Sequence, residues 1–162
     1  MLNRVIGSVR RNHALEHATI SILMGRIGPD VRLIGRATAS GFYIYGNVPP
    51  QDVQESAEQG LSRLQAGESV LAVSPLCGTN LAVAGIMAGL ASTVSAGNRN
   101  RWERLPTVLL ASMLAVLAAQ PLGRLLQKYV TTSPDLKDLR IVEIRGSDRA
   151  RGNYYKVETA RQ

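Results

Sequence analysis

The chain has 162 residues, a formal net charge of +7 and a single cysteine. The length allows one domain, or a small domain with a membrane anchor, and the lone cysteine excludes an internal disulfide and with it a disulfide-stapled secreted domain. The positive charge favours anionic lipid as a partner. Nucleic acid is not expected, because no Lys/Arg-rich run carries interleaved aromatic residues.

The first predicted element is a helix over residues 2–24. Both histidines of the chain lie in it, in an H-x-x-E-H motif formed by His13, Glu16 and His17. Positions i, i+3 and i+4 of a helix share one face. We expect that face to coincide with the apolar stripe of the helix, which consists of Leu2, Val5, Ile6, Val9, Ile20, Met24 and Ile27.

The H-x-x-E-H motif predicts a metal site. Two imidazoles one turn apart can bind one zinc ion, and a glutamate beside them can act as general base for hydrolysis. A glutamate on an apolar face is costly unless it is paired or lies beside a metal. We therefore predict zinc ligation by His13 and His17, with Glu16 as the catalytic base. The alternative is a hydrogen-bonded His/Glu cluster in the core without a metal.

Residues 31–73 are predicted to contain strands and one helix. Apolar residues at 31–34 and 42–45 indicate two strands with a turn between them. Residues 70–73 are interpreted as a further short strand. Between them, a helix is expected to begin at Pro50 and to end at Gly67, with an apolar face formed by Val53, Ala57, Leu61 and Leu64.

Two uncharged segments, residues 81–96 and 105–123, are each close to the ~20 residues that a helix needs to cross a bilayer. The short connection between them carries Trp102, placed as an interfacial anchor. These segments predict a transmembrane helical hairpin; the alternative is two buried helices of a soluble protein. Gly85 and Gly89 form a G-x-x-x-G motif, which allows close contact with the second span or with another copy in a homodimer.

Two spans place both ends of the chain on the same side of the membrane. The residues after the second span are rich in Lys and Arg, and the lone thiol fits a reducing compartment. We therefore expect a two-span protein of the cell membrane, surrounded by the lipid bilayer, with cytoplasmic termini.

The tail is predicted to contain two strands, at 139–145 and 154–158, joined by a turn at 146–152. The whole order indicates an α+β fold. A small α-β-β-α-β domain is followed by a transmembrane helical hairpin, and the C-terminal strand pair completes the sheet. The expected parts are an N-terminal domain, the hairpin and a basic β tail, over residues 1–76, 77–130 and 131–162.

A zinc hydrolase needs three protein ligands, and the two histidines supply only two. Cys77 is the preferred third ligand, because a thiolate is a soft donor and the start of a helix lowers a thiol pKa. The alternative for Cys77 is a small buried residue. Glu55, Glu58 and Asn80 are the other candidates for the third position.

The residues around the H-x-x-E-H motif resemble the zinc-site helix of the pitrilysin/insulysin peptidases, the inverzincins. The similarity extends over residues 12–64 and implies zinc bound by His13 and His17, with Glu16 as base. The chain has no glutamate between Glu68 and Glu103, the region where that family supplies its third ligand.

The whole chain also resembles an uncharacterised bacterial membrane family. That family carries an H-A-L-E-H helix near the N-terminus and a C-G-T-N sequence at the first span, here residues 13–17 and 77–80. This resemblance implies no particular activity, but it strengthens Cys77 as a partner of the histidines.

The sequence therefore favours a membrane-anchored zinc-dependent metalloprotease or related hydrolase. A peptide or a membrane protein is the expected substrate, held by strand addition along an edge at residues 42–45. The alternative is a non-enzymatic membrane accessory or assembly subunit, part of a larger complex, whose histidines bind a structural metal or a cofactor. A channel or carrier is disfavoured, because neither span carries an ionisable residue.

Overall fold

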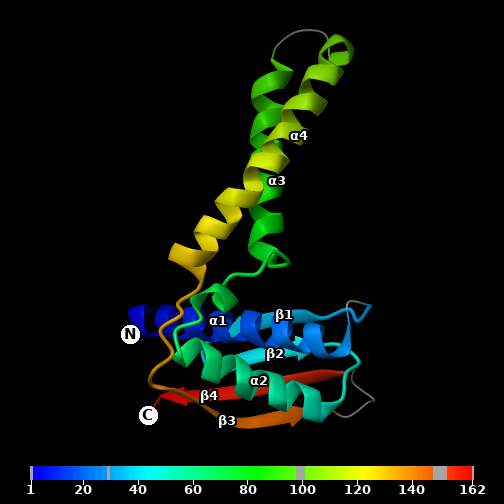
Figure 1. The fold of residues 1–162 in the computed structure, drawn as a ribbon. Helices are drawn as coiled ribbons and strands as arrows, with labels where there is room; N and C mark the ends of the chain where they lie inside the picture. Colours follow the sequence, from blue (N-terminus) through cyan, green and yellow to red (C-terminus); the bar gives the residue numbers. More distant parts are fainter. Residues whose placement is uncertain (1, 29, 98–100, 148–152, 162) are drawn as a thin grey trace. The chain divides into compact units, whose positions relative to one another are not determined.

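A computed structural model describes residues 2–28, 30–97, 101–147 and 153–161 (Figure 1). The chain divides into two compact units. Residues 1–74 and 128–162 form one of them, here called the sheet unit, and residues 75–127 form the other, the hairpin unit. The predicted α+β fold with an apolar helical hairpin is confirmed.

The sheet unit is built on a four-stranded antiparallel sheet in the order β1-β2-β4-β3. β1 (Ile34–Thr38) pairs with β2 (Gly41–Tyr45), and β3 (Leu139–Gly146) pairs with β4 (Tyr154–Arg161). Because β4 also pairs with β2, the tail completes the sheet as predicted. Residues 148–152 of the predicted turn lie outside the described residues.

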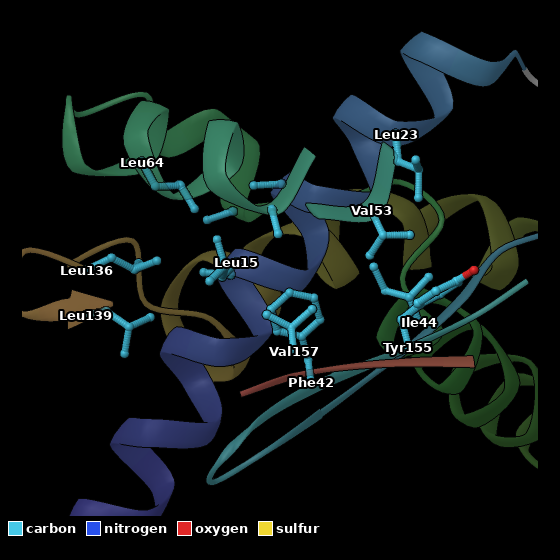
Figure 2. Close-up of a cluster of buried hydrophobic side chains, with 14 of the residues drawn as sticks. Leu15, Leu23, Phe42, Ile44, Val53, Leu64, Leu136, Leu139, Tyr155 and Val157 are labelled. Atoms are coloured by element: carbon cyan, nitrogen blue, oxygen red, sulfur yellow. The ribbon is translucent and has the colours of Figure 1, made fainter. Parts of the chain in front are cut away.

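Two helices cover one face of this sheet. α1 (Leu2–Ile27) and α2 (Pro50–Gln65) pack against each other and contact the strands. Side chains alternate along a strand, and on β2 this places Phe42 and Ile44, both fully buried, toward the helices. Figure 2 shows the resulting core, whose labelled members are Leu15, Leu23, Phe42, Ile44, Val53, Leu64, Leu136, Leu139, Tyr155 and Val157.

The buried face of α1 differs from the predicted apolar stripe. Leu2, Val5 and Ile6 are exposed, and burial along the helix begins at Asn12. Leu15 and other residues of the helix centre fill the core instead. The physical reason is that the sheet and α2 cover only the part of α1 from Asn12 onward, so the apolar residues of its first turns have no core to enter.

Three strand predictions need correction. β1 begins at Ile34 rather than at residue 31, because its five residues pair one for one with the five residues of β2. Residues 70–73 do not form a strand, since a 3-10 helix, η1 (Ser69–Ala72), satisfies this backbone through local hydrogen bonds. The proposed edge at 42–45 is also wrong, because β2 lies between β1 and β4.

The hairpin unit consists of α3 (Gly78–Ala96) and α4 (Arg101–Leu126), and a short π-helix, η2 (Gln127–Thr131), follows α4. Two side-chain hydrogen bonds join α3 to the rest of this unit, one to α4 and one to the first residue of η2. The hydroxyls of Ser92 and Ser112 lie 2.8 Å apart, and the Gln127 amide donates to Asn80 Oδ1 over 2.8 Å. Val83, Ala84 and Ala119 form a small apolar contact between the helices.

Two helices are long and apolar enough to cross a membrane: Gly78–Ala96, which is α3, and Trp102–Thr131, which comprises α4 and η2. Their apolar side chains are mostly exposed, with Val94 at 82% and Leu117 at 68%. A Cβ added at Gly85 or Gly89 would meet no atom within 4 Å. The G-x-x-x-G motif therefore does not contact α4 as one expectation had it, and its use between two copies stays a prediction.

Candidate metal centre

The H-x-x-E-H residues lie on one face of α1, as the helical spacing predicts. Ala14, Leu15 and Ala18 of the same segment are fully buried in the core, which fixes the helix against α2 and the sheet. The rings of His13 and His17 have centroids 4.3 Å apart. The two imidazoles therefore lie next to each other on a regular α-helix.

Each histidine is oriented by a backbone carbonyl. The His17 side chain is buried, and its Nδ1 lies 2.9 Å from the carbonyl oxygen of Ala72 at the end of η1. His13 Nδ1 lies 3.0 Å from the carbonyl oxygen of Thr131 at the end of η2. A carbonyl oxygen only accepts, so Nδ1 must donate in both rings. In a neutral ring this places the lone pair on Nε2, the atom that could bind a metal.

Glu16 lies beside this pair. Its side chain is almost fully buried, and Oε2 is 3.9 Å from His13 Nε2. On its other side the carboxylate lies against the backbone of β1, where a Cβ added at Gly35 would come within 1.9 Å of Oε1. Only glycine leaves room for the carboxylate. Sequence reasoning missed Gly35, although a glycine within a strand often marks such a close approach.

Asn12 fixes the helix at the residue before the motif. It is 1% exposed. Its amide donates to the Thr38 carbonyl over 2.8 Å, and its Oδ1 accepts from the Thr159 hydroxyl over 2.7 Å. These bonds connect α1 to β1 and β4 at once. In the sequence, Asn12 is only a polar residue next to the motif, and nothing there indicates that it connects the helix to two strands.

The remaining candidate ligands are placed as follows. Cys77 belongs to the hairpin unit and caps the N-terminus of α3, where its Sγ accepts a hydrogen bond from the Thr79 amide over 3.4 Å. The Sγ also lies 3.4 Å from the hydroxyl of Thr79. In the sequence, Cys77 lies five residues after Ala72, whose carbonyl is the partner of His17.

The three alternative ligands are engaged elsewhere. Glu55 forms an ion pair with Arg26 on the surface of α2, and the hydrogen bond from that guanidinium lowers the pKa of the carboxyl group. Glu58 accepts from Gln54 on the same surface. Asn80 is buried in the hairpin unit and donates to the Pro75 carbonyl over 2.9 Å.

Comparison with known proteins identifies the family. A family model described as a domain of unknown function (DUF6391) matches residues 8–144, which include the H-x-x-E-H motif and both helices of the hairpin unit. The chain belongs to this family. The DUF6391 match confirms the expected membership of an uncharacterised family, and it assigns no activity to it.

The chain is also similar to an uncharacterized protein of Picosynechococcus sp. (strain ATCC 27264 / PCC 7002 / PR-6). The two are 31% identical over 158 residues, which covers 90% of this chain and 75% of the relative. No solved structure matches the chain.

Proposed function

We propose that this protein is a membrane-anchored zinc-dependent hydrolase of the peptidase type, in which His13, His17 and Cys77 hold the metal and Glu16 is the general base. The observation that carries the proposal is the orientation of the two imidazoles. The Nδ1 atom of each ring is hydrogen-bonded to a backbone carbonyl, which leaves the lone pair on Nε2. The two rings are neighbours, and the buried carboxylate of Glu16 lies beside them.

The residues present suit zinc. Two imidazoles and a thiol are a donor set whose composition is compatible with metal binding. Imidazole and thiolate are the donors that zinc prefers, and a carbonyl behind a ligating histidine is its usual outer partner. Cys77 is tethered to Ala72 by five residues of chain, which span at most about 18 Å. This tether supports Cys77 as the third ligand.

The proposed chemistry assigns one role to each group. A bound zinc ion would supply a Lewis acid and a water of lowered pKa. Glu16 would accept the proton of that water at its carboxylate and return it to the leaving amine. The open space at Gly35 allows the carboxylate to lie against β1, which is an edge strand of the sheet. An extended peptide substrate would pair with this edge, in place of the interior strand first expected.

The membrane location rests on the two apolar helices. Their exposed apolar side chains favour insertion in a bilayer. The pairing of β2 with β4 agrees with two spans, because the segments before and after the hairpin share one sheet and would lie on the same side of a membrane. The proposed side is the cytoplasmic one.

The test is elemental analysis of the full chain purified in detergent, with His13→Ala, His17→Ala and Cys77→Ala as variants and Glu58→Ala as a surface control. We expect about one zinc per chain, the stoichiometry of a mononuclear site, in the wild type and the control, and loss of zinc in each ligand variant. A wild type that stays without metal after zinc is offered would refute the site.

A second candidate function is supported by the same two carbonyl bonds. Ala72 and Thr131 belong to the two segments that join the sheet unit to the hairpin unit, so a metal at the histidines would stabilise both connections. In this case the protein is a non-enzymatic accessory subunit with a structural metal. Three results together would favour this function. The protein would bind stoichiometric zinc, its rate of peptide hydrolysis would not exceed that of the Glu16→Gln variant, and it would co-purify with a larger membrane complex.

A further inference from the structure

The exposed apolar side chains of the sheet unit are concentrated in three segments. Among the residues that the structure describes in this unit, large exposed apolar side chains are found on the sheet at Ile34, Tyr45 and Val142. All the others belong to the first turns of α1, to η1 or to η2, and they are Leu2, Val5, Ile6, Val70, Tyr129 and Val130. We call these six residues the apolar surface.

Hydrogen bonds within the sheet unit connect two of these segments. The guanidinium of Arg10 donates to the carbonyls of Tyr129 and Thr132 over 2.9 and 3.0 Å. The amide of Ser133 donates to the Arg10 carbonyl over 3.0 Å. η1 and η2 also border a common groove of about 390 Å³, lined by Val70, Lys128 and Tyr129 among others. The three segments are therefore neighbours.

The position of the apolar surface relative to a bilayer follows from chain continuity. Tyr129 and Val130 are among the last residues of the apolar helix over Trp102–Thr131. If that helix spans a bilayer, these residues lie where it leaves the hydrocarbon region. Arg10 of α1 is hydrogen-bonded to the backbone of Tyr129, so the start of α1 lies close to this point of the chain.

The chemistry of the surface suits an interface rather than a protein core. Leu2, Val5, Ile6 and Val9 follow the i, i+3, i+4, i+7 pattern of an amphipathic helix. Arg4 and Lys128 supply exposed cations and Tyr129 an aromatic ring. The first turn of α1 contains no acidic residue. Cations and aromatic rings around an apolar stripe are the features of helices that lie in the headgroup region of anionic bilayers.

We propose that the apolar surface is a membrane-interface site that lies among the headgroups of an anionic lipid bilayer. The first turns of α1 act as an interfacial helix, and Arg4 and Lys128 contact lipid phosphates. This inference rests on the membrane location in the proposed function, and it is independent of zinc and of catalysis. It assigns a role to the apolar residues of α1 that the core leaves exposed.

The experiment uses tryptophan fluorescence of the full chain in vesicles. Trp102→Phe removes the single native tryptophan, and one tryptophan is then introduced by Ile6→Trp, Val142→Trp or Leu117→Trp. Val142 is the matched control, because it is an exposed apolar residue of the sheet unit outside the apolar surface. The vesicles contain phosphatidylcholine and phosphatidylglycerol, with bromine on acyl carbons either close to the headgroup or deep in the bilayer.

We expect Ile6→Trp to lose most of its emission to shallow bromine and to emit further to the blue than Val142→Trp. Equal, water-like emission from both proteins would overturn the inference, provided that deep bromine quenches Leu117→Trp. If Leu117→Trp is not quenched either, the membrane location fails and the inference fails with it. Removal of phosphatidylglycerol is expected to weaken quenching of Ile6→Trp, and unchanged quenching would refute the assignment to an anionic surface.

Discussion

Gly35 and Glu16 occupy complementary space, since a Cβ at Gly35 would lie 1.9 Å from Glu16 Oε1. We expect Gly35→Ala to displace the carboxylate and to lower the free energy of unfolding by about 1–3 kcal/mol, as overpacking in a core does. Thermal unfolding measures the loss. Gly25→Ala is the control, because a Cβ there meets no atom within 4 Å and alanine favours a helix. Equal stability of the two variants would show that Glu16 does not need this space.

Asn12 holds α1 to two strands through one side chain. Asn12→Ala leaves the Thr38 carbonyl and the Thr159 hydroxyl without that partner. Both hydrogen bonds are partly buried, so we expect a total loss of about 1–3 kcal/mol. Chemical denaturation measures the change, and Asn3→Ala, in the exposed first turn, is expected to have little effect. In a double-mutant cycle with Thr159→Val, simple additivity would contradict a direct bond.

Glu16→Gln keeps the size of the side chain but removes its capacity to accept a proton. If Glu16 is the general base, zinc content is expected to stay at the wild-type level, while peptide hydrolysis falls by about 10²–10⁴-fold. Glu58→Gln, on the surface of α2, should retain both. Turnover that persists in Glu16→Gln would rule out the assigned mechanism, whereas joint loss of zinc and activity would indicate that Glu16 is a ligand.

Metal removal is expected to destabilise the sheet unit, because both histidines are bonded to the segments that border the hairpin unit. A ligand at one hundred times its Kd stabilises the folded state by about 2.7 kcal/mol. A chelator should therefore lower the Tm of the wild type and leave that of His17→Ala unchanged. The same decrease in both proteins would mean that the chelator acts elsewhere.

The glycines of the hairpin unit are expected to differ sharply in tolerance. Gly85→Leu adds a side chain to open space, so the fold and Tm should not change. Gly123→Leu should lower the Tm, since a Cβ there would lie 2.3 Å from Asn80 Oδ1. Cross-linking in detergent tests the predicted homodimer. Dimers that are lost in Gly85→Leu would assign the G-x-x-x-G motif to contact between copies, and dimers that persist would exclude it.

Local patterns in the sequence were sufficient for several features. The i, i+3, i+4 spacing places His13, Glu16 and His17 on one helical face regardless of what surrounds the helix. Uncharged runs of sufficient length identify α3 and α4, and short runs of β-branched, apolar and aromatic residues next to turn residues identify β2, β3 and β4. All of these depend on residues close to one another in the chain.

The site itself depends on contacts between residues far apart in sequence. The carbonyls that orient His13 and His17 come from Thr131 and Ala72, 118 and 55 residues away along the chain. The space for Glu16 comes from Gly35 on another element. No local pattern encodes such pairs, because a backbone carbonyl is present at every position and only folding selects which one meets the imidazole.

The same reason explains the incorrect strand predictions. Residues 70–73 have the composition of a strand, but whether they pair depends on an available sheet edge, and η1 satisfies its own backbone locally. The position of β2 inside the sheet depends on β4, which lies more than 100 residues later in the chain. Periodicity reports what a segment can form, whereas burial and pairing are properties of the assembled fold.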